Sequence, residues 1–591
     1  MSVETPAVAP TAPARTPWRR PDQRPRLWPA VAALAVYWAA TIIVGRTEKP
    51  YFVGFMFGLI APTLLALFLL GWWWLSRRIR LADRAYGFLI VVAGGLIAWP
   101  LAHPSVGIFG LWMMALPVVL TAWVMWMAVV KWWAPAAYRP GAVVVAAVAW
   151  GSFLLVRHDG LDSDLRTDLR WRWSRSAEDL FLEERAAQQG VHSSAATAET
   201  LTVRPGDWTE FRGPDRDGVI RGAAIATDWA KTPPRLVWRH RVGPGWSSVI
   251  VVDGRLFTQE QHGDREAVVC YDAATGQEVW SHEDPGRFWE SVSGAGPRAT
   301  PTFVDGRLYT FGATGILNCL DAATGKPHWS RDVAAEAGAK PPMWGFSGSP
   351  LVADGLVIVY AGGDGKDLLA YRAATGEPVW TAPAGATSYS SPHLATLAGH
   401  RQCLILTDRG LTSVDPATGS VLWKTGLAMP GAPRTVQPHA VGPTQLLVGT
   451  LDGPGMSLID VTQNGNDWAV SQRWTSKDLK PEFPDFVVHQ GHAYGFDINI
   501  FCCIDLATGK RTWKEGRYGR GQVMLLPEQS LLLVVSETGD VVFLKADPQR
   551  HDELGRFPAI KGKTWSHPVI AHDRLYVRNA EEMACYELRR R

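Results

Sequence analysis

The stretch Asp272-Ala273-Ala274-Thr275-Gly276-Gln277-Glu278-Val279-Trp280 decides the fold, because it recurs along the chain. Further copies run from Asp321 to Trp329, from Asp415 to Trp423 and from Asp505 to Trp513. A fifth copy, Arg372 to Trp380, departs from the motif only at its first residue. Repetition at a near-constant interval predicts a solenoid or a propeller.

Each copy predicts a strand, a tight turn and a second strand. The Asp side chain can hydrogen-bond its own backbone two residues on, and Gly supplies the positive φ that closes such a turn. The Trp begins the next strand and must fill the same gap in every unit, so deleting it should cost ~3–5 kcal/mol. We therefore interpret the motif as a structural docking element.

A second phrase precedes the nonapeptide, an Asp-Gly turn between two apolar runs, as in Val249–Phe257, Thr302–Tyr309 and Leu351–Ile358. Weaker copies lie at 394–406, 440–449, 486–496, 523–535 and 569–577. Asp-Gly between hydrophobic runs is a hairpin signal. Eight phrases predict eight four-stranded antiparallel units.

The tryptophans also predict how the ring closes. The expected docking residues are Trp280, Trp329, Trp380, Trp423, Trp474 and Trp513, with Phe557 at the corresponding place in the next unit. The last unit ends near Leu588 without a Trp strand, and the missing strand is found at the other end, around Trp238. Joining both ends in one blade removes open sheet edges. The expected fold is an all-β eight-bladed β-propeller over residues 205–591.

An α-helical transmembrane region precedes the propeller. Five apolar stretches lie at 27–45, 51–75, 85–102, 107–130 and 141–156, and the second and fourth easily reach the ~20 residues that span a bilayer. No Asp, Glu, Lys or Arg lies within them, which favours an anchor of about five helices over an ion pathway. Residues 1–26, rich in Pro, Ala and Arg, are expected to be a disordered cytoplasmic tail.

The positive charges predict the orientation. They gather before the first stretch, after the second and after the fourth, at Arg15, Arg19, Arg20, Arg24, Arg26, Arg77, Arg78, Arg80, Arg84, Lys131 and Arg139. By the positive-inside rule the N-terminus is cytoplasmic, and five spans place the propeller outside an inner membrane. Trp72–Trp74 and Trp132-Trp133 suit the aromatic belt at the cytoplasmic side.

Residues 157–204 connect the two regions. We expect a segment at the outer membrane surface, then a short helix that begins at a capping box, Ser176–Asp179, and a flexible linker over 190–204. The turn-rich stretch from Trp208 to Gly218 then opens the propeller, either as a packed entry segment or as a ligand loop.

The chain has 591 residues and a net charge of only +3, so no bulk attraction to nucleic acid is expected. The repeat resembles the PQQ-like (pyrroloquinoline quinone) β-propeller repeat of the quinoprotein alcohol dehydrogenase-like superfamily, and Trp208-x-x-Phe211-x-Gly213 is similar to its entry segment. The resemblance covers residues 205–591. It implies either a quinone on the ring axis, with calcium and an acidic base, or a compact propeller without a cofactor.

The segments that enter the innermost strands are the candidate ligand surface, because eight of them converge on one axis. We predict that they bind a ligand or cofactor through Trp246, Arg298, Arg434, Arg520 and Trp565. The three arginines favour an anion. If the chain is an enzyme, Asp485 is the expected base. No residue spacing predicts a metal site, so PQQ and calcium follow from the resemblance alone.

Two cysteines, Cys502-Cys503, have two interpretations. Some quinoprotein dehydrogenases carry adjacent cysteines joined near the cofactor, which this pair resembles. Cys503, however, holds the same repeat position as Cys270, Cys319 and Cys585. That position makes it a small apolar filler of its blade.

Two functions therefore stay open. The first is a membrane-anchored extracytoplasmic binding or scaffolding propeller for an envelope protein, peptide or ligand. The second is a PQQ-dependent oxidoreductase that oxidises an alcohol or sugar and passes electrons to membrane quinone. Residues 205–591 are just long enough for eight plain blades, which leaves little chain to enclose a cofactor.

Overall fold

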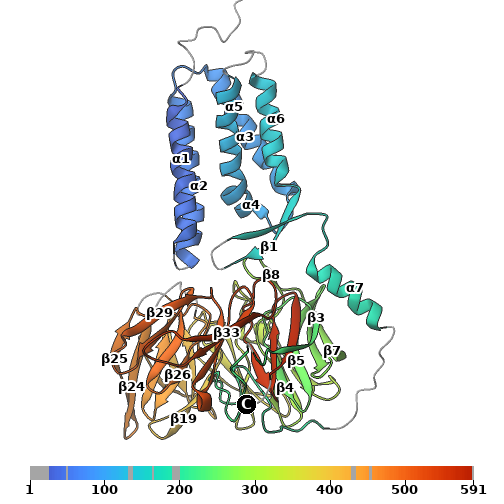
Figure 1. Cartoon of the computed structure of the whole chain (residues 1–591), viewed down its shortest axis with the longest axis vertical. Helices are drawn as coiled ribbons and strands as arrows, with labels where there is room; N and C mark the ends of the chain where they lie inside the picture. Colours follow the sequence, from blue (N-terminus) through green and yellow to red (C-terminus); the bar gives the residue numbers. More distant parts are fainter. Residues whose placement is uncertain are drawn as a thin grey trace, which may run out of the picture. The chain divides into compact units, whose positions relative to one another are not determined.

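The computed structural model describes residues 26–47, 49, 51–130, 138–162, 166–189, 200–229, 231–426, 434–451 and 455–588. They divide into a helical unit that ends at Ser174 and a second unit that begins at Arg175. Helices dominate the first unit and strands dominate the second (Figure 1). Residues 1–25 of the predicted tail and residues 190–199 of the predicted linker lie outside the described residues.

The helical unit contains α1 (Trp28–Arg46), α2 (Tyr51–Leu75), α3 (Leu81–Leu101), the continuous run of α4 (Gly107–Gly110), the π-helix η2 (Leu111–Ala115) and α5 (Leu116–Val130), and α6 (Tyr138–Ser152). Among the described residues, four helical segments are long and apolar enough to cross a membrane: 28–46, 53–75, 81–101 and 107–130. The fifth predicted stretch forms the 15-residue α6.

Two boundaries in this unit differ from the sequence prediction. Helix α3 begins at Leu81, so it includes Asp83, whose carboxylate accepts a 2.8 Å bond from Arg139 at the start of α6. The last predicted stretch ends early, because Val156 already belongs to the hairpin of β1 (Val156–Leu161) and β2 (Thr167–Trp171). The spacing of apolar residues could not locate these two helix ends, because polar and apolar residues are mixed at both places.

In the described residues, eight four-stranded antiparallel sheets form the propeller. The first four blades are β4 (Ile250–Val252), β5 (Arg255–His262), β6 (Arg265–Asp272) and β7 (Glu278–Pro285); β10 (Thr302–Val304), β11 (Arg307–Phe311), β12 (Ile316–Asp321) and β13 (Pro327–Asp332); β14 (Leu351–Ala353), β15 (Leu356–Gly363), β16 (Lys366–Arg372) and β17 (Pro378–Ala382); and β18 (His393–Leu397), β19 (His400–Thr407), β20 (Gly410–Val414) and β21 (Val421–Lys424).

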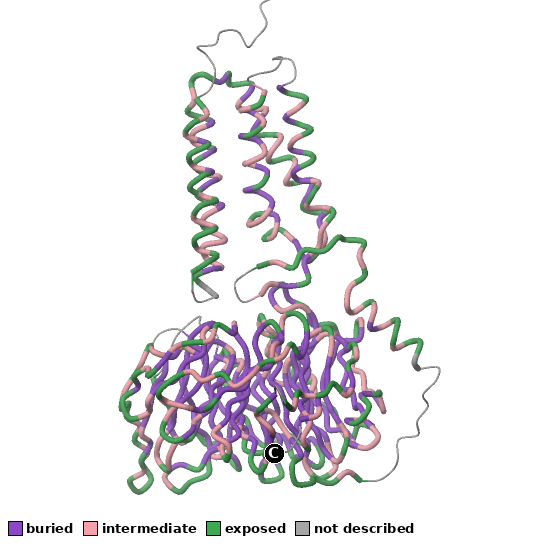
Figure 2. The backbone as a smooth tube through the Cα atoms, viewed as in Figure 1, coloured by how far each residue is buried: buried purple, intermediate pink, exposed green. Residues whose placement is uncertain are grey.

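The last four blades are β22 (His439–Gly442), β23 (Gln445–Gly449), β24 (Met456–Asn464) and β25 (Asp467–Ser476); β26 (Val487–His489), β27 (His492–Asp497), β28 (Ile500–Asp505) and β29 (Arg511–Arg517); β30 (Gln522–Leu526), β31 (Leu531–Val535), β32 (Asp540–Lys545) and β33 (Glu553–Pro558); and β34 (Val569–Ala571), β35 (Arg574–Arg578), β36 (Glu582–Glu587) and β3 (Arg235–Arg241). Strand β3 pairs with β36, which confirms the predicted closure. Buried residues fill the blades (Figure 2).

The docking motif works as predicted in most blades. The indole N–H of Trp280 donates to the carbonyl of Ala322 in the next blade at 3.2 Å. The ring also lies over Gly325, where an added Cβ would come 2.5 Å from a ring carbon. Gly325 is thus required twice, because its φ is +71° as well. Trp238, Trp329, Trp380 and Trp474 repeat this arrangement over Gly276, Gly376, Gly419 and Gly509.

Trp423 docks differently. The blade that follows it contains the long hairpin β24–β25 where five other blades have the Thr-Gly turn. Its indole N–H therefore donates to Gln402 of its own blade at 2.7 Å. Trp468 of β25 packs against the core cluster that contains Trp423. The sequence motif predicted the tryptophan correctly, while its partner depended on the next unit.

The cysteine interpretation is confirmed in its geometry. Cys270, Cys319, Cys503 and Cys585 pair in register with Trp280, Trp329, Trp513 and Trp238. Cys502 and Cys503 point into different core clusters and both are buried free thiols. Burial raises the pKa of Cys503 to about 11, so this thiol is unreactive near neutral pH.

Candidate functional site: the axial mouth

The entry segment crosses the axis of the propeller. Trp208 forms two backbone hydrogen bonds with Val251 of β4, and Ile220 and Gly218 bond to Leu525 of β30. Between these points the segment turns toward other blades, where Arg212 donates to the carbonyl of Phe486 at 2.8 Å. Arg212 and Arg216 are almost completely buried. Of the two interpretations of this stretch, the structure supports the packed entry segment.

Above this segment, a belt of hydrogen bonds joins neighbouring blades. It consists of the bonds Ser248 N to Thr300 Oγ1, Thr300 N to Ser349 Oγ, Ser349 N to Ser391 Oγ, Ser390 Oγ to Val436 O, Gln437 N to Asp485 Oδ2, Gln522 Nε2 to Trp565 O and Ser248 Oγ to His567 O. Small polar residues before each inner strand thus satisfy the backbone groups that face the axis. These loops do converge, as the sequence predicts.

Asp485 belongs to this belt. Its carboxylate lies 3.6 Å from Arg212 and 3.1 Å from Nε2 of His439, and it also accepts the backbone N–H groups of Gln437 and Phe486. Burial raises the pKa of Asp485, but the charges of Arg212 and His439 outweigh it and hold the pKa well below its ordinary value. The geometry therefore makes Asp485 a structural anion, and its role as a base stays a prediction.

Two of the three predicted arginines have acidic partners. Arg298 lies 3.2 Å from Glu290 and against the ring of Phe288, and burial lowers its pKa to about 10. Arg520, fully buried, bonds to Glu482. Arg434 is buried too, and its carbonyl accepts the N–H of Tyr389. Arg298 and Arg520 thus do not present an open anion site.

The predicted tryptophans form an aromatic cluster at the mouth of the axis. The rings of Trp246 and Trp565 lie 5.0 Å apart, and Phe483 meets Trp565 edge-on at 5.0 Å. Lys563 places its ammonium 5.2 Å from the ring of Trp246 and 4.5 Å from that of Trp565. The indole N–H of Trp565 donates to Glu537 at 2.9 Å. We call Trp246, Phe483, Lys563 and Trp565 the axial mouth.

Sequence reasoning missed Phe483, Lys563 and the acids Glu290, Glu482 and Glu537. All five lie outside the two recurring phrases, four of them in irregular segments and Glu290 in the short strand β8 (Trp289–Glu290), so the repeats did not indicate them. Only their position along the chain could have indicated them, because each lies near a predicted inner strand or near the strand next to it in sequence. A second aromatic pair, Trp344 and Tyr389, lies in the same set of loops with ring centroids 4.9 Å apart.

The described part of the chain holds no group of three or more His, Cys, Asp or Glu side chains arranged to hold a metal ion. Near the axis, His393 and His567 are buried, and burial lowers the pKa of each to about 3. Both imidazoles are therefore neutral structural groups rather than proton carriers at neutral pH.

Residues 264–515 match the family model described as outer membrane protein assembly factor BamB, which confirms the PQQ-like repeat. Among curated proteins, none matches the sequence.

Solved structures similar to this chain include BamB from Moraxella catarrhalis, with 16% identity, 60% of this chain and 98% of that chain covered, and a TM-score of 0.42. The quinohemoprotein alcohol dehydrogenase ADHIIG from Pseudomonas putida HK5 has 14% identity, coverages of 65% and 80%, and a TM-score of 0.49. The corresponding enzyme from Comamonas testosteroni has 14% identity, coverages of 69% and 84%, and a TM-score of 0.46.

Proposed function

We propose that this chain, a PQQ-like repeat β-propeller, is a membrane-anchored module that binds a segment of an envelope protein or peptide at its axial mouth. The observation that carries the proposal is the cluster of Trp246, Trp565, Phe483 and Lys563 above an axis already filled by the entry segment. Large aromatic rings with a cation are typical of protein interfaces.

The chemistry of the axial mouth favours a peptide with apolar and acidic side chains. Trp565 and Phe483 are partly exposed, so their rings can cover an apolar side chain. Lys563, whose ammonium also donates to the carbonyl of Val292 at 3.1 Å, gives the mouth a positive charge that attracts a carboxylate. Arg298 and Arg520 are neutralised within the propeller.

Membrane anchoring by five helices rests on α6. This helix begins beside the start of α3, where Arg139 pairs with Asp83 and its carbonyl accepts the hydroxyl of Tyr86. It leads to β1, where the N–H of His158 donates to Ser105, just beyond the end of α3. Since the segment from Arg139 to His158 contacts both ends of α3, we infer that it crosses wherever α3 crosses. The 15 residues of α6 extend ~22 Å, and the turns over 153–155 carry the chain on toward the ~30 Å thickness of a hydrocarbon core.

With five crossings and a cytoplasmic N-terminus, the propeller lies on the extracytoplasmic side of the inner membrane. A reporter fused to the C-terminus tests this topology. Alkaline phosphatase should be active there and a cytoplasmic fluorescent reporter inactive. The opposite pattern would mean that α6 does not cross.

The oxidoreductase alternative fits the residues less well. A quinone carboxylate would have to displace Glu290 or Glu482 from its arginine, and Asp485 already serves Arg212 and His439. Full-length protein titrated with PQQ and calcium, followed by dye reduction with alcohols and sugars, tests this alternative. Tight binding with turnover would replace the binding-module proposal.

Photocrosslinking in intact cells tests the binding function. A photoreactive phenylalanine analogue at Phe483 should capture a discrete partner, whereas the same analogue at Val379, exposed on β17, should not. The product at Phe483 should disappear in a Trp565→Ala, Lys563→Gln background. Equal capture at both positions, or capture that survives both substitutions, would contradict the proposed site.

A further inference from the structure

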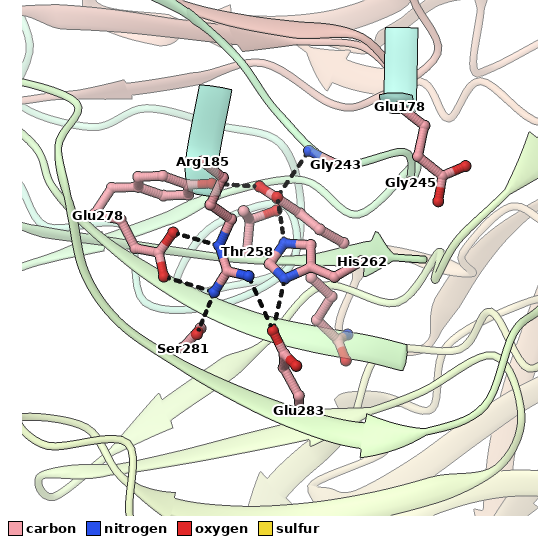
Figure 3. A network of polar contacts seen from close by, with 12 residues as sticks. Glu178, Arg185, Gly243, Gly245, Thr258, His262, Glu278, Ser281 and Glu283 are labelled. Atoms are coloured by element: carbon pink, nitrogen blue, oxygen red, sulfur yellow. Dashed lines mark hydrogen bonds and ion pairs between the residues drawn. The ribbon is translucent and has the colours of Figure 1, made fainter. Parts of the chain in front are cut away.

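Helix α7 (Ala177–Gln189) lies against the outer rim of the first blade, in the same unit as the propeller (Figure 3). Its cap is the predicted one, since Ser176 and Asp179 exchange bonds of 2.8 and 2.9 Å. Glu178 forms two bonds with Arg287, at 2.7 and 2.8 Å. Arg185 forms two bonds with Glu278, at 2.9 and 3.0 Å.

This contact is mainly ionic. Among the described residues of α7, only Phe181 is buried. A half-open cavity of about 550 Å³ lies beside this contact, lined in part by Phe181, Arg185, Arg239 and Tyr271. Because a single described side chain of the helix is buried against the blade, most of its docking depends on the charged contacts, which respond to salt and pH.

His262 of β5 lies directly beneath Phe181, with ring centroids 5.2 Å apart, and its side chain is only 2% exposed. Its Nε2 lies 3.2 Å from Glu260 and its Nδ1 lies 3.0 Å from Glu283. Glu283 also accepts a 3.2 Å bond from Arg185. The carboxylate of Glu283 therefore bonds both to the imidazole of His262 and to Arg185 of α7, as the dashed lines of Figure 3 show.

Charged groups face His262 from every element around it. Glu260, in the same strand as His262, also accepts hydrogen bonds from the hydroxyl of Tyr271 and the N–H of Gly243. The charge of Arg578 also acts on this carboxylate. Glu283 comes from β7 and lies 3.9 Å from Arg265. Arg185 comes from α7. A protonated His262 would thus meet two carboxylates of the blade and one guanidinium of the helix.

These neighbours have opposite effects on the imidazole. Burial lowers the pKa of His262, but its bonds to Glu260 and Glu283 outweigh burial and leave the pKa above its ordinary value. Arg185 lowers it again. Phe181 and Arg185, both from α7, therefore disfavour the charged imidazole. By linkage, a charged imidazole weakens the docking of α7 by the same factor.

We propose that α7 is a releasable strap, clasped to the first blade by Arg185 and Glu178 and loosened when His262 takes up a proton. The docked helix favours the neutral imidazole, so docking is strongest above the pKa of His262 and weakens as the pH falls through it. Glu283 does not cause this loss, because the pKa of its carboxyl is lowered to about 2, first by its bond to His262.

Release would change the tether of the propeller. Helix α7 follows the last residue of the helical unit, Ser174, after two residues. Its 13 residues add little length while docked and up to ~45 Å of chain when released and extended. The strap is independent of what binds at the axial mouth.

Spin-label distances in the full chain, reconstituted in lipid nanodiscs, test the strap. Ala186→Cys and Ala274→Cys are exposed labelling sites, and all six native cysteines are buried. At pH 8.5 we expect one short distance. Toward pH 5 a population of long distances should grow, corresponding to about tenfold weaker docking. A distribution that does not change over this range would overturn the proposal.

Three variants identify the sensor. His262→Gln should stay docked at pH 5, whereas His328→Gln, on exposed β13, should behave like the parent. Arg185→Gln should be more open at pH 8.5 and less sensitive to pH, because only Phe181 still disfavours the proton. Full pH dependence in His262→Gln would overturn the proposal. If that variant does not fold, a parental pH response in Arg185→Gln would do so.

Discussion

Arg212 of the entry segment lies 3.6 Å from the carboxylate of Asp485, and both side chains are buried at the axis. The first residue comes from the segment that opens the propeller, the second from the blade of β26. This ion pair therefore fixes the entry segment to the far side of the ring. Removing one partner would leave an uncompensated buried charge.

Arg212→Met should destabilise the propeller by about 3–5 kcal/mol at pH 7, measured by denaturant unfolding of the full chain in detergent. The matched control is Arg221→Met, whose exposed pairs with Asp215 and Asp217 should contribute less than about 1 kcal/mol. Equal losses in the two variants would show that Arg212 does not hold the segment.

Gly325→Ala tests the docking of Trp280. The substitution adds a Cβ at 2.5 Å from the indole and a side chain at φ +71°, so we expect a loss of about 3 kcal/mol in unfolding free energy. Gly254→Ala is the control, because its φ is +76° but no atom lies within 4 Å of the added Cβ. It should lose only about 1–2 kcal/mol.

Gln402→Leu tests the exceptional docking of Trp423. Its amide oxygen accepts the indole N–H at 2.7 Å and the hydroxyl of Ser413 at 2.6 Å, and both donors are buried. Two unsatisfied donors should cost roughly 2–4 kcal/mol. Gln445→Leu, which removes a partly exposed bond to Asp460, should change stability by less than about 1 kcal/mol. A neutral Gln402→Leu variant would contradict this arrangement.

The buried histidines predict acid sensitivity. The pKa of His393 and of His567 is about 3 in the folded protein, below an ordinary value near 6.5 in the unfolded chain. Their contribution is complete above pH 6.5 and is lost as the pH falls toward 3, because the unfolded state then binds more protons. Between pH 6.5 and 4.5 each should remove about 2–3 kcal/mol.

His393→Gln should therefore flatten the stability curve in this range, whatever its effect at pH 7. Thermal unfolding at half-unit pH steps measures the slope. The exposed His328→Gln variant should keep the parental slope. An unchanged slope in His393→Gln would mean that this imidazole is not held neutral by burial.

The sequence predicted what depends on local pattern. The Thr-Gly turns, the docking tryptophans and the closing strand around Trp238 all follow from short recurring phrases. The position of Arg212 does not, because it lies 274 residues from Phe486, whose carbonyl it bonds. The pairs Arg298 with Glu290 and Arg520 with Glu482 were not predicted for a related reason. Segments outside the repeated phrases have no period from which the positions of their side chains could be inferred.

The pairing of β3 with β36 also determines how late in synthesis the propeller can close. Arg235 and Glu587, which hydrogen-bond across this seam, are 352 residues apart. At ~5–20 residues per second, a ribosome needs about 20 to 70 s to make the interval. During that time the strand that carries Trp238 has no sheet to join. Any factor that shields nascent strands from aggregation should matter most for this strand, the first of the propeller to be made and the last to be paired.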